Sequence, residues 1–399
     1  MTRNYRTILP ILSAGVAAAL IAGCGSGGSG ASGGSTGGSD SSGGKDVKVA
    51  LVVPLTSGNS TYAAQMSNAA DLAADRYNSA AGSKCQLTIT AYDDKGDAGD
   101  ATTVTQNALS ADGEQVIIGA YTSDEALAIK GIAERQGVVF LSTSSLSPAI
   151  TAGAKFTFRV SAQLANYPES YAAFAKKIGL TRPAIVADDS PTGQPLAAPL
   201  RDALVQAGVT PAGPAVIFQA NATSMTATVQ QVQAQHPGSI IVLGAVAADQ
   251  GLLIKTAAQA GLDVPFVGNS AIASPDAQKV AGSAYNSSTI YTFNNTDPSK
   301  PAYKAFVAAY TAKFGEDKSL AEPGAQTYDA VTVLGEALNS TDCDASGAKL
   351  AAALHALPPT TSAAGGTGVK LSFAGGQDGF ENLRLVPFKV VDGQLQSAS

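Results

Sequence analysis

The sequence predicts an α/β protein of two doubly wound lobes, and three observations support this fold class. From Lys45 onward, short runs rich in Val, Ile and Leu alternate with longer Ala-rich amphipathic stretches. The short runs are almost continuously apolar, which is typical of parallel strands that helices cover on both faces. The runs form two consecutive series of about five strands each, and repeated βα units of this length build one open sheet per series.

Each series alternates expected strands with expected helices. The strands of the first series are Val47–Leu55, Gln86–Tyr92, Gln115–Ala120, Val138–Ser142 and Phe156–Val160, and its helices are Tyr62–Ser79, Ala98–Ser110 and Glu125–Gln136. The strands of the second are Pro183–Ala187, Ala215–Gln219, Ser239–Gly244, Pro265–Gly268 and Thr289–Phe293, and its helices are Tyr167–Ile178, Leu196–Ala207, Thr223–Gln235 and Ala248–Ala260. Two more helices, Ala302–Phe314 and Ala325–Asn339, are expected after the second series. Because ligands bind at the carboxyl ends of strands in open α/β sheets, two facing lobes would enclose a site between them.

Composition excludes several kinds of partner and chemistry. The chain has 399 residues, enough for two domains, and a net charge of −6 with no basic stripe, so we expect no nucleic-acid partner. His236 and His355 lie far apart with no Cys at ligand spacing, so we expect no metal and no cofactor. The adjacent acids Asp93-Asp94 and Asp188-Asp189 point to opposite faces of their strand ends, and neither pair forms a catalytic dyad by itself. No set of nucleophile, base and orienting group is evident, so we do not expect an enzyme.

The first residues carry a targeting signal. Arg3 and Arg6 precede an apolar run of about fifteen residues, which is too short to span a bilayer and fits a secretory signal peptide over residues 1–23. The run ends in Leu20-Ile21-Ala22-Gly23-Cys24, which resembles the bacterial lipobox, and this resemblance implies that Cys24 is acylated.

Residues 24–45 are expected to be a tether. From 25 to 44, 17 of 20 residues are Gly or Ser, a composition that forms a flexible coil with a root-mean-square reach of roughly 25 Å. The folded part is therefore expected to work outside the cytoplasmic membrane, in the periplasm or at the cell surface, held to the membrane by a lipid anchor.

Short motifs along the folded part resemble the type I periplasmic-binding-protein family, and within it the branched-chain amino acid (Leu/Ile/Val) receptors of ABC transporters. Each motif alone is weak, but their order and spacing agree over residues 46–399. The motifs are Val49-Ala50-Leu51-Val52-Val53-Pro54-Leu55-Thr56-Ser57-Gly58, Tyr92-Asp93-Asp94, Ile117-Ile118-Gly119-Ala120 leading to Ser123, Ser144 to Pro148, Phe158-Arg159-Val160, Gly268-Asn269-Ser270 and Tyr328-Asp329-Ala330.

The resemblance implies two Rossmann-like lobes, joined by three crossovers, that close on a ligand. The crossovers are expected near Arg159–Ala162, Tyr291–Asn295 and Gly366–Lys370. One lobe would then hold residues 46–160 and 295–366, and the other 161–294 and 367–399.

The resemblance also implies a ligand-binding role for Ser123. The matching Ser offers its hydroxyl and backbone N–H to the ligand carboxylate, as suits a helix N-terminus with its free amides. A Ser at this position also serves as a plain N-cap, and Asp124 and Glu125 in the first turn would repel an anion. Ser123 is therefore expected either to bind the ligand or to act as a helix N-cap only.

Further binding positions follow from matching strand-end loops. Ser144, Ser145 and Leu146 match a loop that offers a carbonyl and a Thr hydroxyl to the ligand's amino group; Leu146 takes the Thr position, or Ser145 or Ser147 does after a one-residue slip. Ser270 takes the position of the acid that pairs with that amino group, and no carboxylate lies between Gly268 and Pro275.

A buried ammonium without an anion is costly. We therefore expect a small carboxylate ligand that lacks a free α-amine, or one whose amine is bound through another residue such as Asp249. An organic acid, an amide or an aromatic carboxylate is then as plausible as a branched-chain amino acid.

Three positions concern the size of the pocket. Tyr62 lies where the family places a ring over the ligand, although a half-buried Tyr at a helix start explains it equally well. Thr192 and Val246 lie where relatives carry aromatic residues, so a roomier pocket or a bulkier ligand is expected.

Cys85 and Cys343 remain after Cys24, fall in the same expected lobe and tend to pair outside the membrane. Closing a loop of this length would contribute about 4–5 kcal/mol in the chain-entropy model. The expected protein is a monomer whose partners are a small molecule, a membrane permease of an ABC importer, and the membrane. Two other classes stay open: a sensor of the same fold that signals to a membrane receptor, and a secreted hydrolase with two acids facing one cleft.

Overall fold

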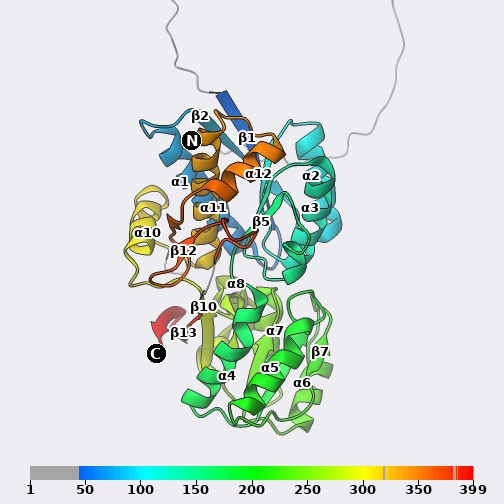
Figure 1. Cartoon of the computed structure of the whole chain (residues 1–399). Coiled ribbons are helices and arrows are strands. Elements are labelled where there is room, and N and C mark those ends of the chain that lie inside the picture. The colour runs from blue at the N-terminus through cyan, green and yellow to red at the C-terminus, as the bar shows by residue number, and fades with distance from the viewer. Residues whose placement is uncertain (1–44, 318–319, 381–382, 384, 399) are drawn as a thin grey trace, which may run out of the picture.

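The computed structural model describes residues 45–398 except 318–319, 381–382 and 384. Two lobes stack end to end, each with its own sheet between helices (Figure 1). The lobe that contains the first strand also carries the helices α11 (Glu322–Ser340) and α12 (Gly347–Ala356) from late in the chain, and the last strands return to the other lobe. Each lobe is thus built from segments far apart in sequence.

Lobe 1 is built on a five-stranded parallel sheet with the order β2-β1-β3-β4-β5. Helices α1 and α11 pack together on one face, and α2 and α3 on the other. Its elements are β1 (Lys45–Val53), α1 (Ser60–Asn78), β2 (Cys85–Asp93), α2 (Ala98–Ser110), β3 (Val116–Gly119), α3 (Ser123–Gln136), β4 (Phe140–Thr143), η1 (Pro148–Ile150), β5 (Thr157–Val160), α10 (Pro301–Phe314), β11 (Thr360–Thr361) and β12 (Lys370–Leu371).

Lobe 2 repeats this order as β7-β6-β8-β9-β10 and extends it with two antiparallel strands, β13 and β14. Its elements are η2 (Leu164–Asn166), α4 (Tyr167–Lys177), β6 (Pro183–Asp188), α5 (Gln194–Gln206), β7 (Val216–Phe218), α6 (Thr226–Ala234), β8 (Ser239–Leu243), α7 (Ala247–Gln259), β9 (Phe266–Gly268), η3 (Ser270–Ala273), α8 (Pro275–Ala281), α9 (Ser283–Ser287), β10 (Ile290–Asn294), β13 (Val386–Val391) and β14 (Gln394–Ser397). The α/β class of two doubly wound lobes predicted from the sequence is confirmed.

The period-2 alternation of each strand supplies both faces of its sheet. In β1, Val49 and Leu51 belong to the core on the α1 side, while Ala50 and Val52 belong to the core on the α2 side. All four side chains are fully buried. This two-sided burial explains why the strands read as continuous apolar runs in the sequence.

The ten expected strands all form, each within two residues of its expected bounds, and the nine expected helices form as well. The structure adds elements that were not predicted: the strands β11 to β14 and the helices α8, α9 and α12. Two of these strands complete the lobe 2 sheet, so only three-dimensional pairing reveals their place.

The third crossover lies later than Gly366–Lys370. Strand β12 pairs with β11, Asp378 forms a bridge with Arg159 of β5, and the ring of Phe373 packs 5.1 Å from that of Phe158. Burial of Phe373 against lobe 1 holds the chain there, and it joins the lobe 2 sheet only at Val386. The expected start of the last lobe 2 segment at residue 367 is therefore corrected.

Asp329, from the Tyr328-Asp329-Ala330 motif, anchors the segment that follows α12. Its carboxylate accepts hydrogen bonds from the amides of Ala363 at 2.7 Å and Ala364 at 2.8 Å. Lys300 donates from the other side to the carbonyls of Ala364 and Val369. Burial raises the pKa of Asp329 to about 7, a cost that the two amide bonds offset in part.

Cys85 and Cys343 are joined by a disulfide in this structure, with their Cα atoms 5.7 Å apart and a sequence separation of 258. Cys85 opens β2 and Cys343 follows the C-terminal end of α11. The bridge therefore fastens the late helix α11 to the N-terminal sheet of the same lobe.

The expected signal peptide of residues 1–23, the expected acylation site Cys24 and the expected tether up to residue 44 lie outside the described residues, whereas Lys45, the last residue of the expected tether, is the first residue of β1. Among the helices that the structure describes, none combines the length and apolar character needed to cross a membrane. In the same part of the chain, no three His, Cys, Asp or Glu side chains gather as a metal-binding group.

Candidate functional site

The strand order places two switch points face to face. In each lobe the order reverses beside the first strand, between β1 and β3 and between β6 and β8. Loops leave the carboxyl ends of strands in opposite directions at such a point and open a crevice for a ligand. The loops that meet here follow β3 and β4 of lobe 1 and β6, β8 and β9 of lobe 2.

A narrow cavity lies where these loops meet. Residues of both lobes line it: Tyr121, Ser144, Ser145, Leu146, Tyr167, Thr192, Ala245, Asn269, Ser270, Glu322 and Pro323. Its volume is about 20 Å³, room for about one water molecule, whereas ligand pockets commonly measure about 300–1,000 Å³. The lobes are thus closed on each other, and a ligand can enter only after they separate.

Direct hydrogen bonds between the lobes hold this closed form. The Tyr62 hydroxyl donates to the carbonyl of Ser270 at 2.8 Å. The hydroxyl oxygens of Ser123 and Thr192 lie 2.9 Å apart. Two further bonds join the N-terminus of α1 to helices of lobe 2: the amide of Ala247 donates to Asn59, and the amide of Thr61 donates to Asp276.

The glycine at the end of β3 lets the next loop approach the first strand. Gly119 has a φ of +133°, and a Cβ there would lie 2.2 Å from the carbonyl oxygen of Val52. Only glycine adopts this conformation without a clash. Tyr121, two residues later, lines the cavity.

Ser123 supports the cavity from behind. Thr122, rather than Ser123, is the N-cap of α3, and its amide donates to Glu125 in a capping box. The Ser123 hydroxyl is therefore free to accept hydrogen bonds from the amides of Leu146 at 3.3 Å and Ser147 at 3.2 Å. It also forms the hydrogen bond with the Thr192 hydroxyl described above. In the closed form Ser123 therefore orders the neighbouring strand-end loop.

Arg159 supports the same loop from beneath. Its side chain is 2% exposed and donates to the carbonyls of Leu146 and Ser147, both at 2.9 Å. Its Nε forms an ion pair with Asp378 at 2.7 Å. The positive charge next to the loop is thus already paired within lobe 1.

Five of the eight predicted binding residues line the cavity, namely Ser144, Ser145, Leu146, Thr192 and Ser270. The other three lie around it. Tyr62 reaches the far side of Ser270, where it borders a separate void of about 10 Å³. Ser123 lies behind the 144–147 loop, and Val246 packs toward Gly58 of lobe 1, while its neighbour Ala245 lines the cavity.

Glu322 is the acidic residue of the cavity that the sequence did not reveal. It opens α11 and is 6% exposed; its Oε1 accepts from the hydroxyl of Ser270 at 2.8 Å, and its Oε2 accepts from the amide of Asn295 at 2.7 Å. Burial raises its pKa to about 7. In sequence it is an acid before Pro323 at a helix start, a common N-terminal pattern that carries no binding signal.

Tyr121, Tyr167, Ala245, Asn269 and Pro323 also line the cavity without having been predicted. Tyr121, Ala245 and Asn269 directly adjoin predicted strand ends, so strand-end position was the signal that could have found them. Tyr167 and Pro323 stand at helix starts, and only packing brings them to the crevice.

The other candidate acids stabilise turns. Asp249 accepts the amides of Asn221 at 2.8 Å and Ala222 at 2.9 Å within lobe 2 and is not among the cavity residues. Burial raises its pKa to about 6. Asp188 accepts from the hydroxyl of Ser190 and the amide of Ala245, which orders two strand-end loops of lobe 2.

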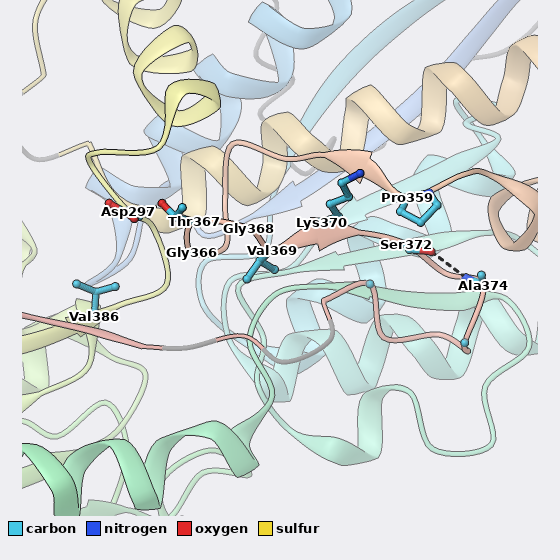
Figure 2. A pocket seen from close by; sticks show the side chains of 12 residues that line it. Asp297, Pro359, Gly366, Thr367, Gly368, Val369, Lys370, Ser372, Ala374 and Val386 are labelled. Carbon is cyan, nitrogen blue, oxygen red and sulfur yellow. Dashed lines mark hydrogen bonds between the residues drawn. The ribbon is translucent and has the colours of Figure 1, made fainter.

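A larger, open depression of about 810 Å³ lies elsewhere, along the segment 366–375 (Figure 2). Asp297 and Thr367 stand at one end of it and Pro359 and Ser372 at the other. Asp297 is already engaged by hydroxyl groups of Ser299 and Thr367, which hold its pKa below the usual range. No switch-point loop borders this depression, so the small cavity between the lobes is the better candidate.

Comparison with known proteins agrees with this geometry. A family model described as periplasmic binding protein matches residues 46–386. The leucine-, isoleucine-, valine-, threonine-, and alanine-binding protein of Pseudomonas aeruginosa is 26% identical over 316 residues, which cover 78% of this chain and 82% of that protein.

Solved structures show the same fold. The leucine binding protein LivK from Thermotoga maritima superposes with a TM-score of 0.78 at 22% identity, covering 88% of this chain and 98% of that one. A solute binding protein of an ABC transporter from Rhodopseudomonas palustris, in complex with 3,4-dihydroxy benzoic acid, superposes with a TM-score of 0.72 at 22% identity, covering 88% and 95%.

Proposed function

This chain belongs to the periplasmic binding protein family, and from that premise we propose that it is the exported, lipid-anchored solute-binding component of an ABC importer. Its named relatives are binding proteins rather than enzymes. The observation that carries the proposal is the cavity between the lobes, to which strand-end loops of both lobes contribute polar side chains.

Closure is the working step of this proposal. A ligand that touches both lobes favours the closed form only by its differential affinity for that form, and about 5.5 kcal/mol moves the balance from 1:99 to 99:1. The closed protein, as a monomer, would then dock on its permease. In the unliganded protein, the hydrogen bonds between the lobes favour the closed form less strongly than a bound ligand does.

The ligand is proposed to be a small amino-acid-like compound or organic acid. Relatives are named for leucine, isoleucine and valine, and a structural neighbour was solved with a dihydroxybenzoic acid. The hydroxyl groups of Ser144, Ser145 and Thr192 line the cavity; in the closed form they bond to Gln326, Thr122 and Ser123, and we propose that the ligand uses their remaining acceptor positions.

A thermal-shift screen of the full chain in mild detergent tests the binding function. A true ligand at 100 times its dissociation constant should add about 2.7 kcal/mol of stability. Small-angle scattering of the same samples should show a smaller radius of gyration with the ligand than without it, because the ligand favours the closed form. If no amino acid, organic acid or aromatic carboxylate raises the melting temperature, the proposal fails.

The lipid anchor has its own test. Cells that express the chain and receive labelled fatty acid should incorporate label into the exported protein, and the Cys24→Ser variant should not. Equal labelling of the two proteins would refute acylation at Cys24.

A further inference from the structure

The charge of the cavity between the lobes is unbalanced. Glu322 is buried there, and each of its oxygens accepts one hydrogen bond from a neutral donor, the Ser270 hydroxyl and the Asn295 amide. An ionised carboxylate has about four acceptor positions, so about half of them remain open. Neutral donors satisfy part of its hydrogen bonding but do not cancel the charge that Glu322 carries when it is ionised.

No basic side chain among the described lining residues pairs with this carboxylate. None of the described residues that line the cavity is Lys, Arg or His. Arg159, beneath the 144–147 loop, already pairs with Asp378. A buried and unpaired carboxylate is costly, which agrees with the raised pKa of Glu322. An anionic ligand without a cationic group would add a second negative charge to the same enclosure.

Two tyrosine rings share the cavity with the carboxylate. Tyr121 and Tyr167 line the cavity together with Glu322, and the ring centroids of Tyr62 and Tyr121 lie 6.0 Å apart. Burial, followed by the charge of Glu322, raises the pKa of Tyr121 above its ordinary value, so the two groups are electrostatically close. Tyr rings attract cations to their faces. A carboxylate among such rings is a favourable place for an ammonium group.

We propose that Glu322 recognises an ammonium group of the ligand, so that the bound solute is an amine-bearing compound rather than a simple carboxylate. This inference rests on the proposed solute-binding function and names the class of solute. It assigns the role of amine partner to lobe 1, at the start of α11, although the sequence pointed to the Ser270 position of lobe 2. On opening of the lobes, Ser270 leaves Glu322 and exposes its open acceptor positions to the incoming group.

Matched ligand pairs test the inference without any variant. Calorimetric titration of the full chain would compare compounds that share a carbon skeleton and a carboxylate but differ in the amine: leucine against 4-methylpentanoate, phenylalanine against 3-phenylpropanoate, and 4-(aminomethyl)benzoate against 4-methylbenzoate. For the pair that binds, the amine-bearing member should bind at least about 100-fold more tightly, because a charged hydrogen bond is lost in the other.

The Glu322→Gln variant then assigns this preference to the residue. This variant should bind the amine-bearing compound about 10- to 100-fold more weakly than the wild type does, and its affinity for the amine-free compound should change by less than about threefold. Ser270→Ala is the matched control, because it removes the lobe 2 partner of Glu322 and keeps the carboxylate. The preference for the amine should survive in this control.

Each other outcome is decisive. If the amine-free members bind the wild-type protein as tightly as their partners do, the inference is overturned and the solute-binding function stands. If Glu322→Gln weakens both members of a pair equally, Glu322 is a latch between the lobes and not a recognition residue. If no compound of these pairs or of the wider screen binds, the proposed function fails, and the inference fails with it.

Discussion

The hydroxyl of Tyr62 is expected to bias the protein toward its closed form. It donates to the carbonyl of Ser270 across the boundary between the lobes, and the Tyr62 side chain is 1% exposed. In the Tyr62→Phe variant that carbonyl stays buried and loses its donor when the lobes close, whereas water can reach it when they open. The substitution therefore acts on the closed form only.

The size of the effect follows from one neutral hydrogen bond. Such a bond contributes about 0.5–1.5 kcal/mol net, so the ratio of closed to open protein should fall by about 2- to 13-fold. Bonds from Ser123 to Thr192 and from Ala247 to Asn59 remain, so closure should weaken without being abolished. Small-angle scattering of the unliganded full chain should show a larger radius of gyration.

Tyr77→Phe is the matched control. The Tyr77 hydroxyl donates to Asn339 at 2.7 Å, and both residues belong to lobe 1, so this variant loses a similar bond within one lobe. It should lower the melting temperature without changing the radius of gyration. An unchanged radius in Tyr62→Phe, or an equal increase in Tyr77→Phe, would refute the assignment of this hydrogen bond to closure.

Three further predictions concern stability. Replacing both Cys85 and Cys343 by Ser should lower the free energy of unfolding by up to about 5 kcal/mol, because the bridge closes a loop of 258 positions; calorimetric melting that matches the wild type would contradict this. Glu322 has its pKa raised from 4.5 to about 7, so the folded protein keeps a proton that the unfolded chain has lost, and stability should fall by about 3 kcal/mol as the pH rises from about 5 to 8. Glu322→Gln should flatten that part of the profile, and a difference from wild type that is the same at both ends would count against the assignment. Arg159→Met should lower the free energy of unfolding in urea by about 2–4 kcal/mol, chiefly because it leaves the buried carbonyls of Leu146 and Ser147 without their donor, whereas Asp378 is partly exposed and keeps a bond from Thr151; a loss below about 1 kcal/mol would show that these bonds are dispensable.

The sequence was sufficient for the fold class and for most element boundaries. Strands that are buried on both faces must be apolar at every position, as in Val116–Gly119, and this local demand is visible in one dimension. The short strands β11 to β14 escaped prediction because their pairing depends on segments brought together only by the finished lobes. The third crossover was placed too early for the same reason, since burial of Phe373 on Phe158 holds the chain on lobe 1.

The candidate site divides in a similar way. Residues at strand ends, such as Ser144 and Thr192, were predictable because parallel strands bring their carboxyl ends to one edge. Glu322 was not predictable, because the sequence at a helix start does not indicate which lobe that helix will contact. The expectation of a ligand without an amine depended on searching for an acid near Ser270 in sequence. The acid that contacts Ser270 comes from a position 52 residues later.

By itself the sequence determined the two-lobed architecture and the edges at which ligand loops gather, and it predicts the acylation and export signals that lie ahead of the described residues. Periodicity and local composition encode such features because each depends on neighbours along the chain. Only the tertiary structure decided which side chains share the enclosure between the lobes and what charge that enclosure holds. Burial and pairing are properties of contacts between distant segments. The carboxylate of Glu322 is therefore buried in the cavity only because α11 contacts the loop after β9.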